Sequence, residues 1–254
     1  MKLTSTTIIL SKSVLALAFI ASLLLLAAGP GSHIGLWHFR TGFTIMKYGA
    51  WLGLAAAVSA CAALVVQFRR RMWKEVILST LALLIGIASF AIPYSWKQTA
   101  GRLPKIHDIS TDTANPPRFV AILPLRKDAP NPAEYGGAEI AAKQVQAYPD
   151  LNTLSLNLPP EHAFGLALET AQRLGWSIVA AVPTEGRIEA SDTTFWFGFT
   201  DDVVIRISPS GKTTLVDIRS VSRVGLSDVG TNARRIRLFM KKLADRIPIA
   251  GFAK

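Results

Sequence analysis

The stretch from Asp217 to Ile236 concentrates the residues of this chain that could do chemistry. It joins an apolar, strand-like run to a helix through serine, arginine, aspartate, glycine and asparagine. Backbone N–H groups at a helix start, together with nearby arginines, form a ready binding site for a phosphate, a lipid headgroup or a carboxylate. The candidate anion site comprises Arg219, Arg223, Ser227, Asp228, Asn232 and Arg235.

The same residues also have a purely structural interpretation. Asp228 can neutralise Arg223 or Arg235, because arginine–carboxylate pairs are strong and geometrically specific. Ser227 is a good N-cap for the helix, and the other serines and Asn232 can bond backbone groups at the bend. The composition favours this second interpretation and leaves the anion site open.

A second candidate is an aromatic run that ends just before Asp201 and Asp202. On a strand, Phe195, Phe197 and Phe199 share one face, which predicts either a plain aromatic core or a wall of an apolar-ligand pocket under the helices. The two aspartates are adjacent and would point to opposite faces of a strand. They therefore make a poor acid–base pair, and a turn start is the favoured interpretation.

Signatures of catalysis are missing from the sequence. It has no G-x-S-x-G elbow, no phosphate-binding or dinucleotide fingerprint and no metal-ligand spacing. We therefore expect no catalytic residue, no metal and no cofactor. His107, Asp108 and Asp112 fit exposed loop polarity better than a metal site. A hydrolase whose triad assembles in space around Ser220 or Ser222 stays a minor alternative.

The positive charge of the chain is concentrated beside apolar segments. The 254 residues carry a formal charge of +11, and half of them are hydrophobic. Residues 1–100 hold nine basic side chains and one acidic, a net +8, which leaves +3 for residues 101–254. Because the sequence shows no basic stripe interleaved with aromatics, we expect no nucleic-acid partner. The predicted partner is the lipid bilayer, with a lipid or anionic ligand as a further candidate.

Residues 1–96 are expected to form a membrane anchor of three helices. A spanning helix needs about 20 apolar residues to cross roughly 30 Å of hydrocarbon. The first run has a cleaved signal peptide as its alternative, although further spans follow it. The three apolar runs are Ser13–Ala28, Tyr48–Val66 and Val76–Tyr94.

The basic cluster Arg69–Arg71 with Lys74 lies between the second and third runs. By the positive-inside rule this loop is cytoplasmic, which places the N-terminus in the cytoplasm and the residues after 97 outside. Lys97, Arg102 and Lys105 argue weakly for the opposite orientation. The sequence thus predicts a multi-pass protein of the bacterial inner membrane with a periplasmic C-terminal domain.

Small residues recur every four positions along the second run, at Gly49, Gly53, Ala57 and Cys61. They would lie on one face of a helix and allow close packing. That face could pack against the other two spans or against a second copy of the chain. Packing within one chain is favoured, and a homo-oligomer formed through Gly49, Gly53 and Ala57 is the alternative.

Composition changes abruptly after Trp96. Prolines punctuate residues 97–150, which are expected to be a loop-rich linker, and residues 151–254 should form the folded domain. The order of elements predicts a two-layer α+β fold in which an antiparallel sheet carries both helices on one face, similar to TBP-like and helix-grip folds. The expected strands cover 151–158, 177–182, 187–199, 202–208 and 213–222, and the expected helices cover 159–174 and 227–247.

Over residues 107–239 the chain resembles a bacterial and plant family called domain of unknown function 1499. That family has no established activity, so the resemblance supplies no catalytic or ligand-binding residue. The matching stretches are HDISTD (His107–Asp112), PPRF (Pro116–Phe119), LGWSIVA (Leu174–Ala180), GRIEASDTTFWFGFTDDVVIR (Gly186–Arg206) and RSVSRVGLSDVGTNARRIR (Arg219–Arg237).

These observations together favour a membrane-anchored, extracytoplasmic binding or scaffold module that does not catalyse a reaction. A protein that binds a lipid or a hydrophobic anion is the first alternative. A cryptic hydrolase is the second.

Overall fold

The computed structural model describes residues 2–247, and side chains from Ser5 onward. The chain divides into two compact units. One comprises Met1–Gly101 with Phe195–Gly198, and the other comprises Arg102–Thr194 with Phe199–Lys254.

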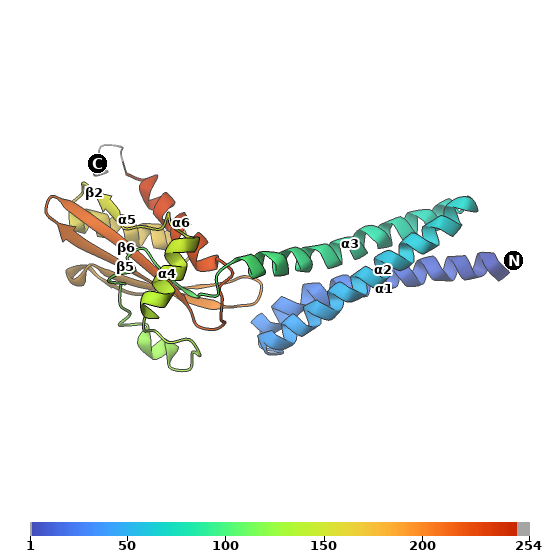
Figure 1. Cartoon of the computed structure of the whole chain (residues 1–254), viewed down its shortest axis with the longest axis horizontal. Coiled ribbons are helices and arrows are strands. Elements are labelled where there is room, and N and C mark those ends of the chain that lie inside the picture. The colour runs from blue at the N-terminus through green and yellow to red at the C-terminus, as the bar shows by residue number, and fades with distance from the viewer. Residues whose placement is uncertain (1, 248–254) are drawn as a thin grey trace. The chain divides into compact units, whose positions relative to one another are not determined.

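The first unit is built from the helices α1 (Lys2–His33), α2 (Phe39–Arg69) and α3 (Trp73–Arg102), which Figure 1 shows as long rods. Within residues 2–247 these are the three helices that are long and apolar enough to cross a membrane. Each contains one of the predicted apolar runs and extends beyond it at both ends. The expected three-helix arrangement of the N-terminal segment is confirmed.

Small residues bring α2 into close contact with both other helices. A side chain at Gly49 would lie 3.2 Å from the carbonyl oxygen of Ala21 in α1. One at Gly53 would lie 2.6 Å from Cβ of Ser89 in α3. The face formed by Gly49, Gly53 and Ala57 is therefore buried against α1 and α3 of the same chain. Cys61 is exposed.

The aromatic run is a turn rather than the end of a strand. Thr194 N–H donates to the carbonyl oxygen of Phe199 at 2.8 Å, and Gly198 takes a left-handed φ of +70°, so the chain reverses here. The expected strand over residues 187–199 stops at Thr193. Phe195, Phe197 and Phe199 consequently do not share a strand face, and the predicted pocket wall is not formed. Phe195 is 86% exposed, whereas the ring of Phe197 lies 4.8 Å from that of Phe43 in α2.

The second unit is organised around an antiparallel six-stranded sheet, formed within residues 102–247 and visible in Figure 1. Its order is β1-β6-β5-β4-β3, and β2 also pairs with β6, alongside β1. The strands are β1 (Asp108–Ser110), β2 (Leu154–Leu156), β3 (Ser177–Val182), β4 (Arg187–Thr193), β5 (Thr200–Ser210) and β6 (Thr213–Ser222). The predicted α+β class with an antiparallel sheet is confirmed, and the sheet is open.

One face of the sheet packs against α5 (Pro160–Arg173) and α6 (Thr231–Ala244). Alternation along β5 and β6 directs Val203, Ile205 and Ile218 into this layer, where they are fully buried. Between the helices and the sheet, the ring of Trp176 stacks on Phe239 at 5.4 Å. This layer is the main hydrophobic core of the domain.

The opposite face is covered by residues 111–136, which are part of the segment that the sequence suggested was a linker. We call residues 111–136 the covering segment. Phe119 and Ile122 pack on Val204 and Val221, which point away from α5 and α6. The boundary at residue 150 therefore differs from the prediction, because the supposed linker supplies β1, the 3₁₀ helix η1 (Leu123–Arg126) and α4 (Gly137–Ala147) to the folded domain. The sequence does not predict this layer, because its elements are short and their apolar residues are too few to form a periodic pattern.

Helix α4 closes the edge of the sheet beside β1. The side chain of Gln144 is buried, accepts the Ser110 N–H at 2.9 Å and donates to the Ser110 carbonyl oxygen at 2.6 Å. A glutamine thus satisfies both backbone groups that an edge strand would otherwise present to solvent.

Candidate functional site

The residues of the predicted anion site lie on both faces of the sheet. Along β6, Arg219 points to the face covered by the segment before α4, and Arg223, just beyond the strand end, bonds to groups on that same face. Asn232 and Arg235 belong to α6, on the other face. The sheet itself therefore separates the arginines of β6 from the polar residues of α6, and the six predicted residues do not form one site.

On the first face, Asp202 is the centre of a buried ion-pair cluster. Arg223 donates to both carboxylate oxygens, through Nε at 2.9 Å and Nη2 at 2.8 Å. Arg126 donates at 2.6 Å and the Ser191 hydroxyl at 2.7 Å. Burial pushes the pKa of Asp202 up, but the hydrogen bonds from Arg223, Ser191 and Arg126 outweigh it and hold the pKa below the ordinary value of 3.8. We call Asp202, Arg126, Arg223 and Ser191 the Asp202 cluster.

On the same face, Arg219 is fully engaged. Its Nε and Nη2 donate to the carboxylate of Asp108 at 2.9 and 2.7 Å, and Nη2 also donates to the carbonyl oxygen of Ala133. The rings of Phe119 and Tyr135 lie 5.2 and 5.4 Å from the guanidinium carbon. Asp108 was predicted to be exposed loop polarity and is instead buried in β1.

On the helix face, Arg235 neutralises two aspartates that lie opposite one another on β4 and β5. Its Nη2 lies 2.8 Å from Asp192 and 2.7 Å from Asp201. Like charges directly opposite in a sheet are destabilising unless a cation offsets them. Nη1 of Arg235 also donates to Asn232 at 2.6 Å, and Asn232 in turn bonds Ser220.

The start of α6 differs from the prediction. The helix begins at Thr231 rather than at Ser227, because Gly230 takes a left-handed φ of +73° immediately before it. Asp228 accepts the N–H groups of Gly230 at 3.0 Å and Asn232 at 2.6 Å. Burial raises the pKa of Asp228 above its ordinary value, and these backbone hydrogen bonds oppose the shift only in part. An aspartate of the chain thus occupies the N–H groups that an anion would need.

Two further buried carboxylates were not identified from the sequence. Glu189 is fully buried and accepts the backbone N–H groups of Val120, Ala121 and Ile122 at 2.9–3.1 Å, together with a hydrogen bond from Arg187. Asp217 accepts from Arg206 at 2.7 Å and from Thr111 at 3.0 Å. Both carboxylates fasten the covering segment to the sheet.

The part of the chain that contains these contacts matches a known protein family. A family model described as protein of unknown function (DUF1499) matches residues 108–243. The chain belongs to the DUF1499 family. No curated protein matches it significantly. The matched range of the DUF1499 domain begins with β1 and ends inside α6, so it includes the covering segment and all the ion pairs described above.

The chemistry available to the polar residues of the DUF1499 domain is limited by these contacts. Asp201 and Asp202 point to opposite faces of β5, as expected, although they lie within the strand and do not start a turn. Ser220 and Ser222 bond Asn232. Among residues 2–247, no group of three or more histidine, cysteine or carboxylate side chains is placed so that it could hold a metal ion.

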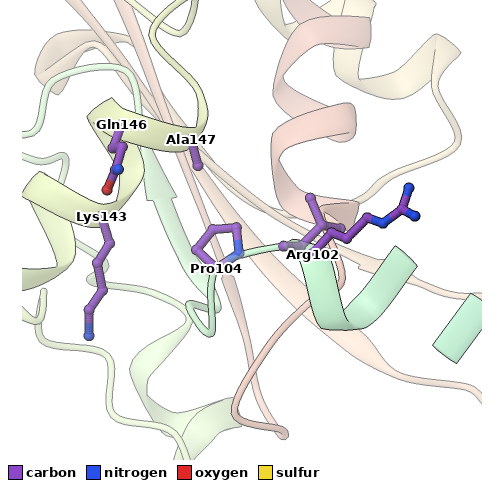
Figure 2. Close-up of a pocket in the computed structure, with 6 residues that line it drawn as sticks. Arg102, Pro104, Lys143, Gln146 and Ala147 are labelled. Carbon is purple, nitrogen blue, oxygen red and sulfur yellow. The ribbon is translucent and has the colours of Figure 1, made fainter. Parts of the chain in front are cut away.

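One surface pocket of the second unit lies between residues 102–104 and α4. It has a volume of about 360 Å³. In Figure 2, Lys143 and Gln146 project from α4 on one side of it, while Arg102 and Pro104 form the other side and the Arg102 guanidinium points away from α4. Because most of its lining side chains are exposed, this pocket is an open basic depression rather than an enclosed ligand site. The lining residues are Arg102, Leu103, Pro104, Lys143, Gln146 and Ala147.

Proposed function

We propose that the protein is a membrane-anchored module of the bacterial inner membrane. In this proposal its DUF1499 domain lies in the periplasm and binds or scaffolds partners without catalysing a reaction. Support for the anchor comes from α1, α2 and α3, which are long and apolar enough to cross a membrane.

The observation that carries the non-catalytic part is the pairing of each candidate arginine with a carboxylate of its own domain. Arg219 pairs with Asp108, Arg223 with Asp202, and Arg235 with Asp192. A guanidinium that already donates to a buried carboxylate has few free N–H groups with which to bind a substrate. Breaking a buried pair typically costs about 3–5 kcal/mol, so a ligand would have to supply that energy. We infer that these residues lock the fold.

Charge supports the proposed orientation. Arg69, Arg70, Arg71 and Lys74 cluster at the turn between α2 and α3, and Glu75 is the one acidic residue of the first hundred. Basic residues in short loops favour the cytoplasmic side. A cytoplasmic turn there sends the end of α3, and the domain that follows it, to the periplasm.

A turnover assay on the full-length protein in detergent tests the non-catalytic part. We expect no hydrolysis of ester, phosphomonoester or glycoside substrates above background. The contradicting result is turnover by the wild type that Arg223→Ala abolishes and Arg234→Ala retains. Arg234 is the matched control, since it is exposed on α6 and makes no ion pair with a carboxylate among residues 2–247.

A further inference from the structure

The loop from Gly225 to Gly230 presents apolar side chains to solvent. Leu226 is 81% exposed and Val229 is 36% exposed. The polar side chains of the same loop, Ser227 and Asp228, are anchored by hydrogen bonds, so these two apolar side chains are held in an ordered loop facing solvent. We call residues 225–230 the apolar loop.

Val229 adds a second, independent observation. Its φ is +50°, in the left-handed region that a β-branched residue rarely adopts. Left-handed backbone costs a non-glycine residue about 1–2 kcal/mol, and asparagine or glycine would relieve it. The chain therefore keeps an apolar, partly exposed side chain at a position where a polar one would strain the backbone less. This indicates a use for the apolar side chain outside the domain core.

The apolar loop is held beside the residues that follow α3. The Ser227 hydroxyl donates to the carbonyl oxygen of Pro104 at 3.2 Å, and the Asp228 N–H donates to that of Ile106 at 3.2 Å. Pro104 is two residues after Arg102, the last residue of α3. Trp96 lies six residues before Arg102, which is about 9 Å along the axis of α3 at 1.5 Å per residue. Tryptophan is typical of the membrane–water interface.

Exposed cations lie near the residues to which the apolar loop is bonded. Arg102 and Lys105 are exposed, and among residues 2–247 neither pairs with a carboxylate. Arg234 is exposed and donates to the carbonyl oxygen of Val229 at 3.1 Å. Lys143, across the basic depression from Pro104, pairs with the exposed Glu139. An apolar tip with exposed cations beside it is suited to an anionic lipid surface, where each basic side chain contributes about 1 kcal/mol.

We propose that the apolar loop inserts Leu226 and Val229 into the interface of the bilayer that holds α3, with Arg102, Lys105 and Arg234 against anionic lipid headgroups. The loop is then a membrane contact of the domain in addition to the helices. This inference rests on the membrane anchoring proposed above. It does not depend on the compartment or on the absence of catalysis.

Depth-dependent quenching tests the insertion. Cys61 is the single cysteine, so Cys61→Ala gives a background for one fluorescent label at a time in the full-length protein. Labels go at Leu226→Cys, at Lys212→Cys and at Leu84→Cys, and the protein is reconstituted in vesicles of phosphatidylethanolamine and phosphatidylglycerol. Lys212 is exposed in the turn between β5 and β6, which lies at the end of β6 away from the apolar loop. Leu84 is exposed in α3.

We expect lipid-borne nitroxide to quench the label at position 226 several-fold more than that at 212, and aqueous iodide to show the reverse order. A label at 226 that behaves like the one at 212, while that at 84 is quenched by lipid, overturns the insertion and leaves the anchor intact. Protection of position 226 from both quenchers would mean contact with protein and also overturns it. Loss of lipid quenching at position 84 would instead contradict the anchor itself.

Discussion

The Arg223 guanidinium donates hydrogen bonds to both oxygens of the Asp202 carboxylate, from Nε at 2.9 Å and from Nη2 at 2.8 Å. Arg223 lies just beyond the end of β6, and Asp202 lies in β5. The pair therefore ties the polar junction after β6 to the neighbouring strand. In the sequence the junction resembles an anion site, because its arginines are close together while the aspartates that pair with them are far away along the chain.

Removing the Asp202 charge should destabilise the domain strongly. Asp202→Asn leaves Arg126 and Arg223 without their carboxylate, and breaking a buried pair costs about 3–5 kcal/mol. The matched control is Asp150→Asn, which breaks the exposed pair with Arg237 and should cost under about 1 kcal/mol. Chemical denaturation followed by circular dichroism measures both. Equal losses for the two variants would contradict a locking role for the Asp202 cluster.

The same cluster predicts a pH dependence. The pKa of Asp202 is lower in the folded protein than its ordinary value of 3.8. A depressed carboxyl pKa contributes stability that is present above 3.8 and is lost as the pH falls through the folded pKa. The difference in unfolding free energy between wild type and Asp202→Asn should therefore shrink as the pH falls below 3.8. A difference that stays constant down to the lowest pH at which the domain is folded would contradict this assignment.

Glu189 should control the order of the covering segment. Glu189→Ala removes the acceptor of three consecutive N–H groups, so the amides of Val120, Ala121 and Ile122 should exchange with deuterium much faster. Glu185→Ala is the control, because Glu185 also pairs with Arg187 but is half-exposed. Unchanged exchange in Glu189→Ala would mean that apolar packing alone holds this segment.

Relief of backbone strain at Val229 should stabilise the domain. Val229→Asn places a residue that tolerates a left-handed φ at +50°, and we expect a gain of about 0.5–1 kcal/mol. Leu226→Asn serves as the control, since Leu226 is exposed and does not take a positive φ. Thermal unfolding of the full-length protein in detergent measures both. A loss of stability in Val229→Asn would show that the valine side chain packs usefully within the domain.

Close packing between α2 and α3 should be sensitive to a single methyl group. A Cβ at Gly86 would lie 2.6 Å from the carbonyl oxygen of Gly53, so Gly86→Ala should cost about 1–3 kcal/mol through overpacking. Gly101→Ala is the control, because nothing lies within 4 Å of its Cβ position. Melting temperatures of the purified protein compare the two, and a Gly86→Ala variant as stable as Gly101→Ala would argue against this contact.

Much of the fold could be predicted because local signals were strong. The strands 177–182 and 213–222 were placed with their observed ends, since alternation and glycine or proline turns bound them. Helix α4 was missed because its buried contact to β1 is made by Gln144, a polar residue that no apolar periodicity detects. The strand β1 was missed because it is three residues long.

The candidate site was less predictable for a different reason. The composition indicated arginine–aspartate pairing, but the partners are far apart in the chain. Arg219 and Asp108 are 111 residues apart, and Arg126 and Asp202 are 76 apart. Asp228 was expected to neutralise an arginine, and it binds backbone N–H groups instead. The tertiary fold, rather than the local sequence, decides which charges meet.

Membrane topology is the most direct test of the proposed function. A phosphatase reporter that is active only outside the cytoplasm, fused after Lys254, should be active, and a fluorescent protein that folds only in the cytoplasm, fused at the same place, should stay dark. As a control, the phosphatase fused after Arg71, in the turn between α2 and α3, should be inactive. An inactive phosphatase and a bright fluorescent protein after Lys254 would place the DUF1499 domain in the cytoplasm and contradict the account.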